Sequence, residues 1–242
     1  MKGAALVIPA WHEAEAIGAL LDEVPARTVD DVFVVVGSAD DPTASIARAR
    51  GAIVVVPARR GYGAACWTGA QAAIANEAHV IAFLDGDYSD PPAALPRILA
   101  PIARGEADLV LGIRDLRQHP NALPTHARVG NSVVLWLMGR SIGHHYADLP
   151  SFKAVRADAL RALDMHEMTY GWTVEMLVKA TRAGLRVQQL GIDYRPRLGG
   201  RSKVAGSARG TLGAAFKLMA CAIAYAAWRP RPAVQWSIAS GR

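Results

Sequence analysis

The chain has 242 residues, of which 52% are hydrophobic, and a formal net charge of +6. This length can bury one core of ordinary size and argues against two domains of independent function. Cys66 and Cys221 are too few and too far apart for a disulfide framework or a metal-ligand cluster, so we expect two buried thiols in a reducing compartment. No apolar stretch reaches the roughly 20 residues of a spanning helix, because Lys217 interrupts the longest one, 212–228.

Short apolar runs alternate with segments of helical periodicity in the first half of the chain. The runs predict strands at 4–8, 32–36, 53–56, 80–84 and 109–113, the first of them ended by Pro9. Helices are expected at 13–24 and 43–50, and from the turn at 59–63 to Ala78. Alternation at this spacing predicts an α/β fold with a doubly wound, mostly parallel sheet flanked by helices.

Four polar loops follow predicted strands, at residues 9–13, 37–41, 59–63 and 85–90. In folds of this kind, ligands bind beyond the carboxyl ends of the strands. We therefore expect the four loops to converge on one site.

The most distinctive loop is FLDGDYSDPP at residues 83–92. An apolar strand delivers Asp85 and Asp87 into the crevice, with Ser89 and Asp90 just beyond. Hard oxygen donors in this position suit Mg²⁺ or Mn²⁺ held jointly with a substrate pyrophosphate. The alternative is an Asp-Gly turn in which Asp90 caps the next helix.

The loop ARRGYGAACW at residues 58–67 places two arginines and two glycines between a strand and a helix. Such a loop could cradle a phosphate on its backbone N–H groups. A dinucleotide-binding fingerprint is disfavoured, because its glycines should follow the first strand, which here ends in Pro9-Ala10-Trp11.

The C-terminal part of the chain is strongly basic. From Arg182 onward there are eleven Lys or Arg residues and one acid, Asp193. So much positive charge must either contact an anionic partner or be exposed to solvent. Residues 207–228 are expected to form an amphipathic helix that lies at a membrane surface without crossing it. A core or dimer-packing helix is the alternative. We divide the chain into a domain at 1–206 and this helix with its tail at 207–242.

The order of these motifs resembles the family 2 glycosyltransferases, and within them the branch similar to dolichyl-phosphate mannosyltransferase, which acts on polyprenyl phosphates. The resemblance covers the chain to about residue 210. It rests on the segments VIPAWHE (7–13), GSADDPT (37–43), RGYGAA (60–65), FLDGDYSDPP (83–92), DLPSFKAVR (148–156), YGWTVEM (170–176) and YRPRLGGRSK (194–203). It implies a GT-A fold.

The resemblance also implies roles for individual residues. The nucleotide-sugar would be bound by Pro9, Trp11, Glu13, Gly37, Asp40, Arg60, Gly61, Asp85, Gly86 and Asp87. The metal would be held by Asp85, Asp87 and Ser89, with Asp87 as the main ligand. The acceptor phosphate would be bound by Arg114, Arg128 and Ser132; ordinary surface salt bridges are the alternative for the two arginines. Arg201, Ser202 and Lys203 would form a mobile loop closing over the phosphates.

Glu175 falls in a predicted helix. Relatives that glycosylate a hydroxyl use an acid in this region as a general base, whereas a phosphate acceptor is already anionic and needs none. Glu175 is therefore either a catalytic base or a positioning residue.

Two positions depart from the family pattern. Val35 and Val36 stand where the family has two acids that recognise the nucleoside, and His12 stands where asparagine is common. Asp40 or Asp41 could replace the missing acids. The same loss leaves open a non-catalytic scaffold that binds a nucleotide or a lipid.

The function implied is that of an inverting hexosyltransferase that moves a sugar from a UDP- or GDP-sugar to a polyprenyl phosphate or another membrane-associated acceptor. Mg²⁺ or Mn²⁺ is the expected cofactor. We expect a cytoplasmic enzyme, peripheral on the inner face of the membrane, without a nucleic-acid partner, and leave a homodimer open. A sugar nucleotidyltransferase is a further alternative, although the glycine-rich basic signature after the first strand is missing.

Overall fold

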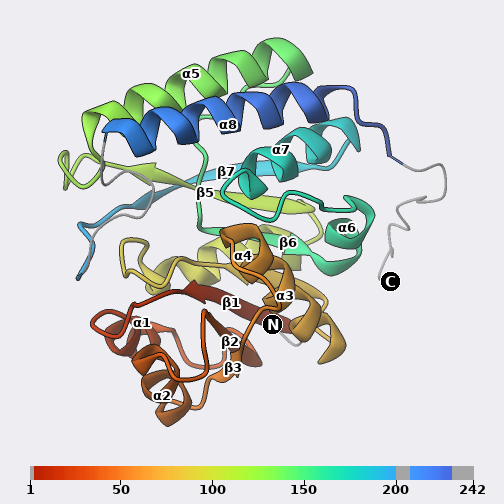
Figure 1. The fold of residues 1–242 in the computed structure, drawn as a ribbon. Coiled ribbons are helices and arrows are strands. Elements are labelled where there is room, and N and C mark those ends of the chain that lie inside the picture. The colour runs from red at the N-terminus through yellow and green to blue at the C-terminus, as the bar shows by residue number, and fades with distance from the viewer. Residues whose placement is uncertain (1–2, 200–207, 231–242) are drawn as a thin grey trace.

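The computed structural model describes residues 3–199 and 208–230 (Figure 1). Its strands are β1 (Ala4–Ala10), β2 (Asp31–Val36), β3 (Ile53–Val55), β4 (Val80–Phe83), β5 (Leu109–Asp115), β6 (Lys153–Arg156) and β7 (Val187–Asp193). Its helices are α1 (Ile17–Glu23), α2 (Pro42–Ala49), α3 (Tyr62–Ala75), α4 (Leu95–Ala103), α5 (Thr125–Ile142), α6 (Ala157–Ala162), α7 (Trp172–Arg182) and α8 (Ala208–Ala226), with a 3₁₀ turn at Pro92–Ala94.

The strands form one sheet in the order β3-β2-β1-β4-β6-β5-β7. All neighbouring pairs are parallel except those of β6, which is antiparallel to both β4 and β5. The α/β fold with a mostly parallel sheet is thus confirmed. Because β6 runs the other way, its first residues lie at the same edge as the carboxyl ends of β4 and β5.

Side chains alternate between the two faces of the sheet, and each face has its own core. Along β1, Ala5 and Val7 face a core shared with α3, α5, α7 and α8. Leu6 and Ile8 face a core shared with α1, α2 and α4. On the first face α7 is buried along most of its length, with α5 and α8 packed outside it (Figure 1).

Strand β1 continues through Pro9 to Ala10, so the expectation that Pro9 ends it is wrong. The carbonyl groups of Val7 and Pro9 accept hydrogen bonds from Leu84 and Gly86, which places the backbone nitrogen of Pro9 on the side of β4. Strand β4 has already ended there, at Phe83. Pro9 has no N–H to donate on that side, so the regular pairing between β1 and β4 stops at this level.

The helix expected at 207–228 is observed as α8. Its inner face packs on α5 and α7 and buries Cys221 and Ala222. Among the described residues, no helix combines the length and apolar character needed to cross a bilayer. Cys66 and Cys221 are buried free thiols, and burial raises the pKa of each to about 12. The domain boundary expected at 206 falls outside the described residues.

Candidate active site

Three of the four expected loops form a cleft of about 410 Å³ at the carboxyl edge of the sheet. It is lined by Trp11, His12, Gly37, Ser38, Asp40, Asp41, Pro42 and Arg60. The Arg60 guanidinium lies 5.3 Å from the centroid of the Trp11 ring, and this ring also packs against Gly37. An exposed aromatic face beside an arginine suits a flat base and a phosphate.

The fourth loop joins the cleft through the acid pair. The Gly86 N–H donates to the Pro9 carbonyl, and a Cβ on Gly86 would lie 2.8 Å from that of Ala10. Only glycine allows this approach, which brings the turn between Asp85 and Asp87 against the end of β1. The expected convergence of the four loops is therefore observed.

The two carboxylates of the pair have different surroundings. Asp87 Oδ1 accepts hydrogen bonds from the Ser89 N–H (2.9 Å) and hydroxyl (2.6 Å), so Ser89 fixes the orientation of this carboxylate. Among the described residues, Asp85 Oδ1 is buried and accepts no hydrogen bond. Burial, followed by the charge on Asp87, raises the pKa of Asp85 to about 6.

Three further polar side chains, those of Asp90, Ser151 and Lys153, lie near the acid pair. The sequence predicted no role in the site for Ser151 or Lys153, and for Asp90 it offered the role of a helix cap. Asp90 is buried and accepts a hydrogen bond from the Ser151 hydroxyl at 2.6 Å, and burial, followed by the charge on Asp85, raises its pKa to about 7. Lys153 is fully buried at the start of β6. Its ammonium group donates to the Pro150 carbonyl (2.9 Å) and the Thr173 hydroxyl (3.1 Å), and burial lowers its pKa. A buried cation thus faces a cluster of acids.

Arg197 is a second residue that sequence reasoning missed. Its guanidinium lies 3.2 Å from Glu13 Oε1 and 3.2 Å from Asp87 Oδ2. Backbone hydrogen bonds from Arg195 to Ser89 and from Leu198 to Asp87 hold its segment against the acid loop. The signal in the sequence is its place in the segment YRPRLGGRSK.

The glycine loop is built differently from the expectation. The N–H groups of Gly63 and Ala64 donate to the carbonyls of Thr169 and Met168, so they are not open to a phosphate. Gly61 has a φ of 143°, and a Cβ there would meet the Met168 carbonyl oxygen at 2.2 Å. The glycines allow the start of α3 to dock on this segment, which corrects the phosphate-cradle interpretation for Gly63 and Ala64.

The two arginines expected at the acceptor have different environments. Arg114, at the end of β5, is half-buried and makes a bidentate ion pair with Asp148 while lying over the Tyr194 ring. Arg128 is exposed near the start of α5, and Ser132 is exposed one turn later, its hydroxyl bonded to the Arg128 carbonyl. Arg201, Ser202 and Lys203 lie outside the described residues.

Glu175 does not face the cleft. Its side chain is fully buried and pairs with Lys179 at 2.7 Å. Its two oxygens also accept hydrogen bonds from the N–H groups of His166 (2.8 Å) and Glu167 (2.6 Å). Of the two roles considered, this geometry favours positioning over base catalysis, because Glu175 holds the segment on which α3 docks.

Val35 and Val36 are buried in the two cores and cannot contact a nucleoside. Asp41 is also buried, where its carboxylate caps α2 through the Thr43 N–H. Asp40 is exposed at the cleft.

His12 has a φ of 56°, a conformation that asparagine tolerates well, so the backbone explains why asparagine suits this position.

Within the described residues, no group of three or more His, Cys, Asp or Glu side chains is arranged to hold a metal alone. The acid pair nevertheless fits a metal shared with a substrate. Asp85 Oδ1 is buried and has no hydrogen-bond partner in the part of the chain that the structure describes, and the charge of a second carboxylate, Asp87, acts on Asp85. A further cation would offset the repulsion from Asp87, which adds to burial in raising the pKa of Asp85.

Comparisons with known proteins agree with this geometry. The model of glycosyl transferase family 2 matches residues 5–163. An uncharacterized glycosyltransferase of Mycobacterium tuberculosis is 37% identical over 210 residues, 86% of this chain and 92% of that protein. The undecaprenyl-phosphate mannosyltransferase of Micrococcus luteus is 29% identical over 218 residues, 83% of this chain and 86% of that protein.

A solved structure with the same fold is that of glucosyl-3-phosphoglycerate synthase from Mycobacterium tuberculosis, in complex with Mn²⁺, UDP-glucose and phosphoglyceric acid. The TM-score is 0.74 at 22% identity, over 96% of this chain and 81% of that one. The likeness shows that the chain has the GT-A fold.

Proposed function

Because the chain belongs to glycosyl transferase family 2, we propose that it transfers a hexosyl group from a nucleoside diphosphate sugar to a lipid-borne phosphate, with a divalent cation at Asp85 and Asp87. The observation that carries the proposal is the acid pair, one oxygen of which is buried and has no hydrogen-bond partner within residues 3–199 and 208–230. The pair lies beside a cleft with an exposed tryptophan and an arginine. The cation would neutralise charge on the departing nucleoside diphosphate.

Different residues of the chain would then bind the donor and position the acid pair. Trp11 and Asp40 bind the nucleoside, while Arg60 lies where it can meet the phosphates. Ser89 and Gly86 hold the carboxylates in place from behind. No general base is needed, because the acceptor oxygen of a phosphate is already anionic.

A lipid phosphate is the acceptor that the relatives support. The Micrococcus luteus relative is named for transfer to undecaprenyl phosphate. The solved neighbour instead holds phosphoglyceric acid, a small water-soluble phosphate. The two acceptors share a phosphate and differ in the lipid, so an experiment can separate them.

A transfer assay with radiolabelled UDP-glucose, UDP-galactose and GDP-mannose tests the proposal. Each donor is combined with undecaprenyl phosphate in detergent or with 3-phosphoglycerate, with Mn²⁺ or with EDTA. We expect label in the organic phase for one donor, with Mn²⁺ only. If every donor binds but none gives a labelled lipid, the lipid-acceptor proposal is wrong. Label transferred to 3-phosphoglycerate alone would replace it with a soluble acceptor.

A further inference from the structure

The outer face of α5 is apolar where a helix facing water is normally polar. Val129, Val133 and Trp136 are exposed, with relative accessibilities of 59%, 45% and 63%. Their spacing of four and three residues places them on one side of the helix. The opposite side buries Val134 and Met138 in the core, so α5 presents apolar side chains in both directions.

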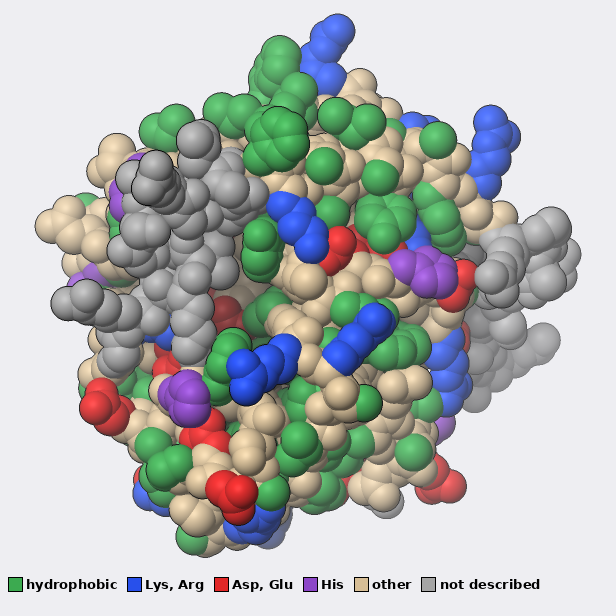
Figure 2. Space-filling model, in the orientation of Figure 1, with side chains coloured by type: hydrophobic (Ala, Val, Ile, Leu, Met, Phe, Trp, Pro, Cys, Tyr) green, Lys and Arg blue, Asp and Glu red, His purple; other side chains and the backbone are tan. Residues whose placement is uncertain are grey.

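Helix α8 extends this face. Phe216 and Ile223 are 73% and 65% exposed, and the alanines 220, 224 and 227 are exposed on the same side. The two helices pack side by side, and hydrophobic side chains gather over them at the top of the molecule in Figure 2. We call the surface formed by Val129, Val133, Trp136, Phe216 and Ile223 the apolar face. Isolated exposed apolar residues are normal, but a continuous patch on two helices marks an interaction site.

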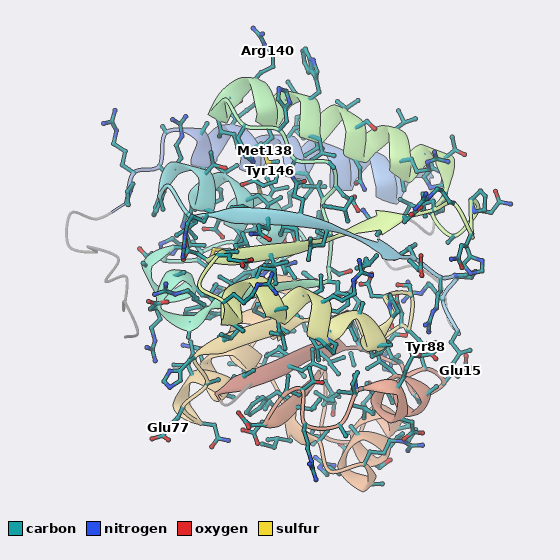
Figure 3. The ribbon with its side chains drawn as sticks, turned by 180° about the vertical axis from the view of Figure 1, so that it is seen from behind. Glu15, Glu77, Tyr88, Met138, Arg140 and Tyr146 are labelled. Carbon is teal, nitrogen blue, oxygen red and sulfur yellow. The ribbon has the colours of Figure 1, made fainter. Side chains whose placement is uncertain are left out.

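The charges on these helices have one sign. Neither α5 nor α8 contains Asp or Glu. Arg128 and Arg140 are exposed on the same side of α5 as Trp136, and Arg140 projects away from the body of the protein (Figure 3). Arg229 is exposed just beyond α8. Lys217 is an exception, because its ammonium group turns inward to Glu167 at 3.2 Å.

The apolar side chains and the arginines together indicate which partner binds this face. A second copy of the chain would bring the arginines of two identical faces together, with no carboxylate on either helix to pair with them. An anionic lipid surface supplies the missing negative charge and a medium for the apolar side chains. We propose that the apolar face docks on an anionic bilayer, with α5 and α8 lying in its interface.

Docking would bring the membrane to the residues expected at the acceptor. Arg128 and Ser132 are exposed in the first half of α5, the helix that follows β5, which carries Arg114. A phosphate held at headgroup level would meet Arg128 while its lipid tail stays in the bilayer. This step rests on the proposed function, whereas docking itself does not.

Co-sedimentation of the full chain with vesicles tests the docking. The vesicles contain phosphatidylcholine with or without about one third phosphatidylglycerol, at low and high salt. We expect binding that needs phosphatidylglycerol and weakens with salt, and a loss of at least fivefold in the bound fraction for Val133→Gln/Trp136→Gln. Val56→Gln is the matched control, because Val56 is as exposed as Val133 (45%) but lies just beyond β3, far from the apolar face. Melting temperatures verify that the variants are folded.

Equal binding of the double variant and the wild type, or no binding of the wild type, would overturn the docking proposal. So would a change from dimer to monomer in the double variant, by sedimentation velocity, with vesicle binding unchanged. Transfer to a short-chain, water-soluble prenyl phosphate separates the two proposals. If the proposed function is right, the double variant should still transfer the sugar to this acceptor. If the proposed function is wrong and docking is right, neither the wild type nor the variant should transfer it, while the wild type still binds vesicles.

Discussion

The Arg197 guanidinium lies 3.2 Å from Asp87 Oδ2, at the carboxylate where a divalent cation is proposed to bind. A bound cation and the guanidinium would therefore compete for one oxygen. We expect Arg197→Ala to bind Mn²⁺ about tenfold more tightly without nucleotide, because removing one positive charge from so near is worth at least ~1.4 kcal/mol. Calorimetric titration measures this. Arg195→Ala is the control, because that neighbouring arginine binds Glu23 instead. Equal affinities for Arg197→Ala and the wild type would exclude competition.

Asp87→Asn should abolish Mn²⁺-dependent binding of UDP and lower transfer by about a thousandfold, since loss of a metal-held leaving group costs several kcal/mol. The fold should persist, as judged by thermal melting. Glu77→Gln provides a matched control, because this acid is exposed and precedes β4, whereas Asp87 follows it. Figure 3 shows Glu77 far from Tyr88, the residue after Asp87. A variant at Asp87 with normal turnover would end the metal hypothesis.

The two acids of the second loop should separate binding from stability. Asp40→Ala is expected to weaken nucleotide binding about tenfold with an unchanged melting temperature, because Asp40 is exposed at the cleft. Asp41→Ala should cost about 1 kcal/mol of stability, because it removes the cap of α2. Calorimetry with UDP and GDP and thermal melting of both variants verify this. The reverse pattern would assign the nucleoside to Asp41.

The ion pair between Glu23 and Arg195 should make stability depend on pH. The hydrogen bond from Arg195 lowers the pKa of Glu23, so the folded protein binds fewer protons there than the unfolded chain. The stabilisation is present above the ordinary pKa of 4.5 and is lost as the pH falls through the lowered value. Glu23→Gln should therefore reduce the free energy of unfolding by about 0.5–1 kcal/mol at pH 7 and by less at pH 3. Urea unfolding at both pH values measures the difference, and a larger loss at pH 3 would contradict it.

Glu175→Gln should act on stability. It leaves Lys179 buried without its charge partner, which costs about 3–5 kcal/mol, while the pH profile of transfer keeps its shape. Unfolding in urea and initial rates between pH 5 and 9 test the two parts. If the variant keeps its stability but its transfer rate no longer falls at low pH, Glu175 is instead a general base.

Much of the fold could be predicted, because β2, β4 and β5 are nearly continuous apolar runs. Such runs identify buried strands from the local sequence alone. Strand β6 could not be predicted, because its four residues begin with a lysine and its place between β4 and β5 depends on neighbours distant in the chain. The direction of β6 explains why Lys153 and Ser151 were missed at the acid cluster.

The site shows the same division between local and distant information. The acid pair could be predicted, because both residues follow directly from one buried strand. Arg197 could not, because its partner Glu13 lies 184 residues away. Nor can a sequence show which way a glycine N–H points, and at Gly63 it points to backbone.

The ion pair between Arg114 and Asp148 closes the base of a long excursion that leaves the sheet at the end of β5, includes α5, and returns at β6. With its two ends tied together, the excursion leaves and re-enters the sheet at one edge, because β5 and β6 are antiparallel neighbours. A change of length in the loops that flank α5 should therefore leave the register between β5 and β6 in place.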